Sequence, residues 1–311
     1  MSNDTYRYIF GPVVSRRIGR SLGVDVLPPK TCTYDCVYCQ LGRTTHKTAE
    51  RGEFVPLEEV LAELRRKLDE DRHIDYITVV GSGEPTLYSR LGEFIAAVKA
   101  LTNVPVAVIT NGSLFWRPEV RAELLLADLV IPSLDAGDET MFQEVNRPCD
   151  GIAFEQMVEG LAAFRREYPG QIWLEVLLLA GVTDEQVTRI KALADTIRPD
   201  RIQLNTAVRP PTFSTARPLA AEALNRIAAV LGEHAEVVAD VAPAEDAANR
   251  SATPGEVLNM LRRHPASVSE TAINLSITEQ NARECIEALL DSGEIEAHRL
   301  EKGTYYRART G

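Results

Sequence analysis

The sequence predicts an α/β fold built on a parallel sheet, followed by a small C-terminal module. Short apolar runs alternate with amphipathic segments in six strand–helix units, and the connections between them are short. This alternation is typical of a parallel sheet with helices packed outside it. Six units are too few for the common eight-unit barrel. A polar, proline-containing stretch of small residues at 241–252 then suits a linker.

Each predicted strand is a short apolar run, and the predicted helices have apolar residues at helical spacing. Pro28 and Pro29 end the first strand, and Thr183 is a suitable N-cap for one helix. We therefore expect one large domain at residues 1–240, with residues 212–240 as its C-terminal extension. The predicted strands cover residues 22–27, 74–80, 105–110, 129–132, 172–179, 202–204 and 236–240. The predicted helices cover residues 56–68, 91–101, 118–126, 154–168, 183–197 and 219–232.

Residues 253–311 are predicted to form a second domain of three helices and a hairpin. Thr253 and Pro254 suit the start of the first helix, and Gly293 suits the end of the third. The second and third helices are expected at residues 267–275 and 278–292, and the hairpin turns at Lys302-Gly303. This order of elements resembles a winged-helix domain. Because it carries its own helix caps and hairpin, we expect the larger domain to fold without it.

The charges of this second domain give two hypotheses for its role. A helix that binds a nucleic-acid duplex should be basic, whereas the third helix here is acidic. Its charged residues are Glu279, Glu284, Glu287 and Asp291 against Arg283. The hairpin is more basic, with Arg299, Lys302, Arg307 and Arg309. The hairpin would therefore contact RNA, or the domain would dock on a protein, a peptide or the larger domain.

Composition and charge argue against a membrane protein, a disulfide-rich protein and a non-specific nucleic-acid-binding protein. The chain has 311 residues, 45% of them hydrophobic, and a net charge of −11, which disfavours broad attraction to nucleic acid. The sequence shows no signal-peptide pattern and no run of membrane-spanning length, so we expect no membrane partner. Five cysteines, three of them on one loop, do not suggest a disulfide framework. The reducing cytoplasm is the predicted location.

Cys32, Cys36 and Cys39 are the strongest functional signal in the chain. Three thiolates on one short loop are metal ligands or redox thiols. An iron–sulfur cluster closed by protein normally takes four cysteines, so three would leave one iron open to another ligand. The alternatives are a zinc site completed by His46 or a group of buried thiols. The two remaining cysteines, Cys149 and Cys285, are expected in the core.

Polar and glycine-rich segments follow three of the predicted strands. They are Gly81-Ser-Gly-Glu-Pro85, Thr110-Asn-Gly112 and Ser133-Leu-Asp135. Ligands of parallel α/β sheets bind at the carboxyl ends of the strands, where these segments fall. Glycine lets a backbone approach a ligand closely, and Glu84 can accept a hydrogen bond from an ammonium group. Each segment alone is also typical of a simple turn.

The spacing C-x3-C-x2-C, with Tyr38 before the last cysteine, resembles the signature of radical S-adenosylmethionine (SAM) enzymes. The resemblance implies a partial (β/α)6 barrel in which the three cysteines hold a [4Fe–4S] cluster and SAM takes the fourth iron. An external one-electron donor, such as flavodoxin or ferredoxin, would reduce the cluster, and SAM would be cleaved to methionine and a 5′-deoxyadenosyl radical. The SAM-binding residues that the resemblance implies are Tyr38, Gly81, Gly83, Glu84, Pro85, Thr110, Asn111, Ser133 and Asp135.

Further segments are similar to a poorly characterised group of radical SAM proteins related to the tRNA-modifying wybutosine enzyme. The segments are Phe10-Gly-Pro-Val, Ser15-Arg-Arg, Leu41-Gly-Arg-Thr-Thr45, Gly83-Glu-Pro-Thr86, Ser133-Leu-Asp-Ala136 and Asn146-Arg-Pro148. The chain lacks the flavodoxin-like domain of that enzyme, and no residue matches its substrate lysine.

Charged and amide side chains on or near the predicted strands are candidates for substrate binding. Guanidinium groups before the cysteine loop would meet an anionic substrate or the SAM carboxylate, or they belong to a solvated loop. Glu175 lies in an apolar strand, where it would face substrate or form an internal ion pair. The candidates are Arg16, Arg17, Arg20, Asp25, Arg147, Glu175, Gln203, Asn205 and Arg209.

Three functions remain open on the sequence. The first is a radical SAM enzyme acting on tRNA or another RNA, on a peptide, or on a small molecule. The second is a regulator that uses an iron–sulfur cluster as a sensor and the winged helix to bind nucleic acid. The third is a zinc-binding module without catalysis.

Overall fold

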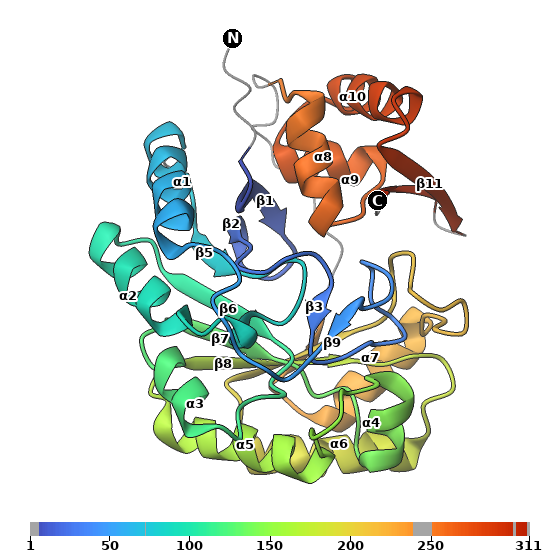
Figure 1. The fold of residues 1–311 in the computed structure, drawn as a ribbon. Coiled ribbons are helices and arrows are strands. Elements are labelled where there is room, and N and C mark those ends of the chain that lie inside the picture. The colour runs from blue at the N-terminus through green and yellow to red at the C-terminus, as the bar shows by residue number, and fades with distance from the viewer. Residues whose placement is uncertain (1–5, 72, 239–250, 301–302, 310–311) are drawn as a thin grey trace.

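The computed structural model describes residues 6–71, 73–238, 251–300 and 303–309. Buried apolar side chains form one large core under the sheet and a separate core in the C-terminal module, which we define as residues 251–309. Figure 1 shows the module above the strands β1 and β2, with the sheet and its helices below. The predicted linker at 241–252 lies outside the described residues except for Ser251 and Ala252.

The sheet has eight strands in the order β1-β2-β5-β6-β7-β8-β9-β10. All neighbours from β2 onward pair in parallel, as predicted, whereas β1 pairs with β2 antiparallel. The central strands β5, β6 and β7 are short apolar runs, because both faces of a parallel sheet are covered. The strands are β1 (Ile9–Ser15), β2 (Gly19–Val24), β5 (Tyr76–Val79), β6 (Val106–Thr110), β7 (Leu129–Pro132), β8 (Gln171–Leu177), β9 (Arg201–Asn205) and β10 (Ala235–Val237).

Helices cover the convex face of the sheet (Figure 1). The predicted helices are confirmed, and two short ones were not predicted: α4, which Asp138 caps, and η1, which Glu84 caps. Both contain too few turns to show helical spacing. The helices of this domain are α1 (Leu57–Glu70), η1 (Pro85–Leu87), α2 (Leu91–Leu101), α3 (Pro118–Leu124), α4 (Glu139–Val145), α5 (Phe154–Glu167), α6 (Asp184–Ile197) and α7 (Ala221–Leu231).

The turn between β1 and β2 folds into the concave face of the sheet. Its Ile18 is 5% exposed and packs with Ala107, Leu129, Ile131 and Trp173, which lie on β6, β7 and β8. A side chain from one edge of a sheet reaches strands near the other edge only when the sheet curves, as in a partial barrel. Of the two alternatives for the arginine-rich segment before the cysteine loop, the solvated loop is wrong, because most of this segment pairs as the strands β1 and β2.

The C-terminal module consists of three helices and an antiparallel hairpin. Its helices are α8 (Pro254–Arg263), α9 (Val268–Leu275) and α10 (Glu279–Asp291), and its strands are β11 (Ile295–Leu300) and β12 (Gly303–Ala308). Thr253 and Ser267 each begin a helix with a capping box, so the local sequence determines these helix starts. The predicted turn at Lys302-Gly303 includes Lys302, which lies outside the described residues.

The module is joined to the sheet domain by polar contacts as well as by packing. Asn259 donates to the backbone oxygens of Tyr6 and Ile9, and Arg263 donates to Asp25, which is 3% exposed. Val13 of β1 packs against the core of the module. Independent folding of the larger domain stays a prediction, and these contacts count against it, because Arg263 of the module supplies the cation beside the buried Asp25 carboxylate.

One contact at this junction should make stability depend on pH. Arg209 donates to His264 Nε2 at 2.9 Å, and Arg209 also faces Glu270. Burial lowers the pKa of His264 well below its usual range, and the charges of Arg209, Arg16 and Arg17 lower it further. The folded protein therefore keeps this histidine neutral, while the unfolded chain binds a proton below pH about 6.5. Stability is present above that pH and is lost as the pH falls below it.

We expect this loss to reach about 1.4 kcal/mol per pH unit below pH 6. Urea unfolding at pH 7.5, 6.5 and 5.5 measures it in the parent and in His264→Gln, which keeps an acceptor for Arg209. The variant should show the smaller slope of unfolding free energy with pH. Equal slopes would contradict the assignment to His264.

Candidate active site

The cysteine loop begins where a short strand ends beside the sheet. β3 (Thr31–Cys32) pairs with β4 (His46–Lys47). Cys32 is the last residue of β3, and Cys36 and Cys39 lie in the loop between β3 and β4, where the Cys39 N–H donates to Cys36 O. All three cysteines are half-buried, and none forms a disulfide. Cys149 and Cys285 are 7% and 4% exposed in the two cores, as predicted.

Two of these thiols each have a side-chain amide donor beside them. Asn111 Nδ2 lies 3.7 Å from Cys32 Sγ, and Asn146 Nδ2 lies 3.6 Å from Cys36 Sγ. Burial raises the pKa of Cys32 to about 12 and that of Cys36 well above its usual value. The charges of the neighbouring cysteines also raise both values, so the three thiols lie within electrostatic range of one another. Positive charge among them would be needed to hold them as thiolates.

A single bound ion does not match the described part of this site. No three His, Cys, Asp or Glu side chains of the described residues surround one ion position. His46, the predicted fourth zinc ligand, is exposed on β4. In an iron–sulfur cluster each cysteine binds a different iron, so its ligands need not converge on one point.

Gly83 brings the loop after β5 directly onto the cysteine strand. A Cβ at this position would lie 1.6 Å from the backbone oxygen of Thr31, so no larger residue fits without moving that strand. The Glu84 N–H donates to the same oxygen at 3.1 Å, and the Lys30 N–H donates to Ser82 O at 2.8 Å. The segments at residues 81–85 and 30–39 are therefore held together as one unit.

Glu84 lies beneath this unit and not at its surface. It is 1% exposed, and its carboxylate accepts from Thr86 N–H, Thr86 Oγ1, Thr110 Oγ1 and Asn111 N–H. Burial raises the pKa of Glu84, and these hydrogen bonds oppose the rise. The predicted acceptor for an ammonium group thus ties the ends of β5 and β6 together.

Glutamine at position 84 should therefore cost stability. The variant Glu84→Gln turns an amide N–H toward one of these donors, and we expect a loss of about 1.5–3 kcal/mol in the free energy of unfolding. Chemical denaturation of the cluster-free protein measures the loss. Unchanged stability combined with a tenfold or larger loss of SAM affinity would show that Glu84 contacts SAM directly.

Asp135 occupies the corresponding place after β7. Its Oδ2 accepts from Tyr38 OH and Asn146 Nδ2, and its Oδ1 accepts from the Leu177 N–H. Burial raises the pKa of Asp135 to about 6. Asn146 thus bridges Cys36 and Asp135; the sequence reasoning did not select it as a site residue, although its Asn-Arg-Pro segment was noted. Thr33, which accepts from Asn111, was also missed because a lone threonine gives no signal.

The predicted SAM-binding residues fall into two groups by exposure. One group is half-buried: Tyr38, Gly81, Gly83, Asn111 and Ser133. The other group is buried: Glu84, Pro85, Thr110 and Asp135. The roles of both groups toward SAM stay predictions.

The predicted substrate residues separate as well. Arg17 NH2 donates to Glu175 Oε1, and Asn205 donates to the same oxygen at 3.3 Å, so Glu175 is an internal ion-pair partner on the concave face. Arg147 instead lies over the Phe213 ring, at 4.2 Å, near the cysteine loop.

Three more of the substrate-binding candidates contact residues other than Arg17, Glu175 and Asn205. Arg20 donates to Asp71 and Ser276. Asp25 receives Arg263 of the module, and Gln203 donates to Glu236. These three therefore have structural partners.

A family model for the radical SAM superfamily matches residues 26–194, which include the cysteine loop and the ends of four strands. The chain belongs to the radical SAM superfamily. As a radical SAM protein it is an enzyme, and its cofactors are a [4Fe–4S] cluster and SAM. The residues present fit the cluster: three thiols without disulfides share one loop, and amide donors point at two of them.

Relatives extend the match beyond the radical SAM region. A protein named GTPase Obg from Brachyspira hyodysenteriae is 40% identical over 92% of this chain, which spans only 43% of that protein's length. A UPF0026 protein of Helicobacter pylori strain J99 is 33% identical over 99% of this chain and 100% of its own length. A radical SAM methyltransferase from Sphaerobacter thermophilus has a similar fold, with a TM-score of 0.52, 19% identity, and coverage of 70% of this chain and 65% of that one.

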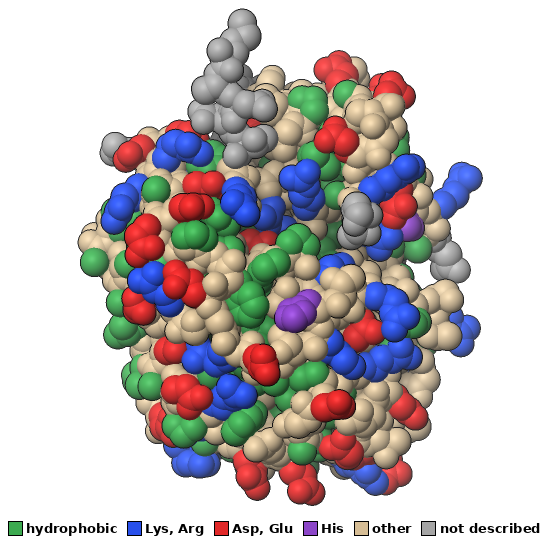
Figure 2. Space-filling model, viewed as in Figure 1, with side chains coloured by type: hydrophobic (Ala, Val, Ile, Leu, Met, Phe, Trp, Pro, Cys, Tyr) green, Lys and Arg blue, Asp and Glu red, His purple; other side chains and the backbone are tan. Residues whose placement is uncertain are grey.

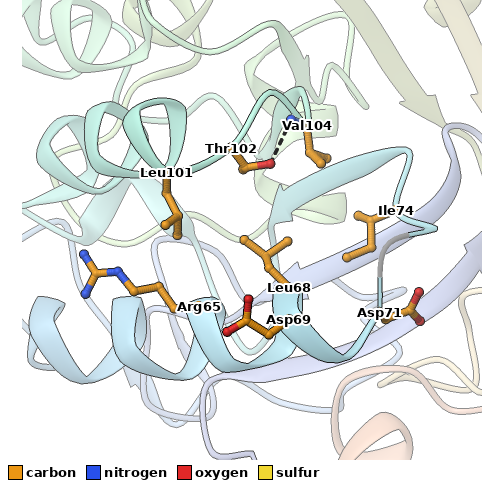
Figure 3. A pocket seen from close by; sticks show the side chains of 8 residues that line it. All are labelled: Arg65, Leu68, Asp69, Asp71, Ile74, Leu101, Thr102 and Val104. Carbon is orange, nitrogen blue, oxygen red and sulfur yellow. Dashed lines mark hydrogen bonds between the residues drawn. The ribbon is translucent and has the colours of Figure 1, made fainter.

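A surface pocket lies at the other end of the sheet from the radical SAM site. Figure 3 shows it between α1 and the end of α2. Its residues Ile74 and Val104 lie two residues before β5 and β6, whereas the cysteines lie toward the carboxyl ends of the strands. The full lining is Arg65, Leu68, Asp69, Asp71, Ile74, Leu101, Thr102 and Val104.

None of the described helices is both long and apolar enough to cross a membrane.

Proposed function

We propose that Cys32, Cys36 and Cys39 hold the cluster of a radical SAM enzyme and that SAM binds on the ends of β5, β6 and β7 beside them. The observation that carries this proposal is the close packing of the Gly83 segment on the cysteine strand, which puts a glycine backbone next to three thiols. When reduced by one electron, the cluster supplies the chemistry that cleaves SAM to methionine and a 5′-deoxyadenosyl radical, which abstracts hydrogen from a substrate.

The half-buried residues of the site would contact SAM, and the buried residues would position them. The backbone of Gly81 and Gly83 and the side chains of Tyr38, Asn111 and Ser133 would contact SAM. Glu84, Pro85, Thr110 and Asp135 would position them, because each is buried. Rigid support of this kind is needed, since a reactive group misplaced by about an ångström loses much of its rate.

The substrate classes stay those predicted from the sequence, which are tRNA or another RNA, a peptide, or a small molecule, and flavodoxin or ferredoxin is the expected electron donor. The regulator hypothesis has less support. Residues Glu279, Glu284, Glu287 and Asp291 are all exposed on α10, and Figure 2 shows the acidic side chains on the upper face of the C-terminal module. Acidic groups on a helix repel the phosphates of a duplex.

Anaerobic reconstitution tests the proposal. The full chain is incubated with iron and sulfide, reduced, and supplied with SAM. We expect visible absorbance of an iron–sulfur cluster and slow formation of 5′-deoxyadenosine without substrate. A protein that binds zinc and forms no 5′-deoxyadenosine would refute the proposal. A protein that assembles a cluster, leaves SAM intact and binds DNA would support the regulator instead.

A further inference from the structure

Side chains from three separate parts of the chain meet beside the concave face of the sheet. Arg16 and Arg17 come from the turn between β1 and β2, Arg209 follows β9, and His264 follows α8 in the C-terminal module. Arg209 NH2 donates to His264 Nε2 at 2.9 Å. Arg17 and Asn205 donate to the same oxygen of Glu175, so the turn lies beside the end of β9, four residues before Arg209. The charges of Arg16 and Arg17 also lower the pKa of both Arg209 and His264.

Arg209 is a buried cation with incomplete pairing. It is 8% exposed, and its Nε is buried without a hydrogen-bond partner in the part of the chain that the structure describes. A guanidinium cannot accept a hydrogen bond, so His264 must accept through Nε2 and is a neutral partner. Glu270 lies 3.5 Å from Arg209 NH2. Burial lowers the pKa of Arg209 to about 10, which shows that Glu270 offsets the cost of burial only in part.

Arg17, on the concave face of the sheet, likewise lacks an acceptor for its Nε–H within the described part of the chain. Its NH2 donates to Glu175 Oε1, but its Nε is buried and, among the described residues, has no acceptor. Glu175 Oε1 also accepts from Asn205. The guanidinium groups of Arg17 and Arg209 thus each keep one buried Nε–H that no described protein atom accepts. Buried donors in native proteins are nearly always paired, and an orphaned one points to a missing partner.

We propose that Arg17, Arg209 and His264 form a binding site for an oxyanion of the substrate, a phosphate or a carboxylate. Arg209 is the main anchor, because a guanidinium matches the planar or forked oxygens of these groups. The C-terminal module completes the site through His264, which orients the guanidinium. The proposal rests on the proposed function, since the oxyanion belongs to the molecule on which the enzyme acts.

Calorimetric titration of the full chain, without cluster or SAM, tests the site. Inorganic phosphate and succinate are added separately at constant ionic strength, with chloride replaced by the anion. We expect one of them to bind the parent protein and Arg209→Gln to weaken that binding by about tenfold or more. The matched control is Arg201→Gln, on the same strand region but 53% exposed, which should bind like the parent. Binding of phosphate alone or of succinate alone identifies which oxyanion the site takes.

Several outcomes would overturn the proposal. They are binding of neither anion to the parent, equal binding by Arg209→Gln and the parent, and displacement of the bound anion by SAM, which would assign the site to the SAM carboxylate. If Arg209→Gln does not fold, Arg17→Gln replaces it, and unchanged binding there counts in the same way. Because these titrations need no cluster, failure here with 5′-deoxyadenosine still formed refutes the anion site alone, whereas anion binding without 5′-deoxyadenosine refutes only the proposed chemistry.

Discussion

Alanine at Cys32, Cys36 or Cys39 is expected to abolish both the visible absorbance of the reconstituted cluster and the cleavage of SAM. Each cysteine of a three-cysteine site binds its own iron, so two thiolates cannot hold the cluster in a defined position. Loss of any one should reduce 5′-deoxyadenosine to the background level. Absorbance spectra and product analysis under anaerobic conditions measure both effects.

The fourth and fifth cysteines provide the control for this result. The control variants are Cys285→Ala and Cys149→Ala. Cys285 lies in the separate core of the C-terminal module, and Cys149 lies in the core of the sheet domain. Both should keep the cluster, although each loses some packing. If any of the three loop variants retains SAM cleavage, or if Cys285→Ala loses the cluster, the assignment of the ligands is wrong.

The sequence was sufficient to predict the parallel sheet and the end of its strands at which the cysteine loop and the polar segments lie. Apolar runs of strand length marked each parallel strand, and polar residues at their carboxyl ends marked the side on which the cysteines lie. The cysteine spacing and the Gly83 segment were visible as local patterns. Local patterns succeed here because strand ends, glycines and ligand spacing are determined over a few residues.

What the sequence could not show depends on contacts between distant residues. Ile18 belongs to a turn rich in arginine, and nothing near it indicates that it enters the concave face of the sheet. The enclosure of the Glu84 carboxylate by Thr110 and Asn111 is a second such contact, and binding of an ammonium group by Glu84 stays a prediction. The partner of Asp25 lies 238 residues away, at Arg263. No local pattern predicts such a pair.

The Asp25–Arg263 pair connects the C-terminal module to the loop that carries the candidate SAM site. Asp25 is 3% exposed and accepts from Ser82 N–H at 3.2 Å and Ser82 Oγ at 2.5 Å. Arg263 Nε donates to Asp25 Oδ2 at 2.8 Å, and Arg263 NH2 donates to Arg7 O at 2.7 Å. A carboxylate buried this deeply needs a paired charge, so Arg263 holds Asp25 and, through it, the segment at residues 81–85.

Methionine at position 263 should therefore lower the free energy of unfolding by about 3–5 kcal/mol, because it leaves the Asp25 carboxylate buried without its cation. The exposed neighbour Arg262 provides the matched control, and Arg262→Met should change stability by less than about 0.5 kcal/mol. Asp25→Asn combined with Arg263→Met should recover much of the loss, since the double variant no longer buries an unpaired charge. Urea unfolding of all four proteins measures these terms. If Arg263→Met were as stable as Arg262→Met, the module would not support the sheet domain, and a chain ending at Asn249 would fold and cleave SAM as well as the full chain.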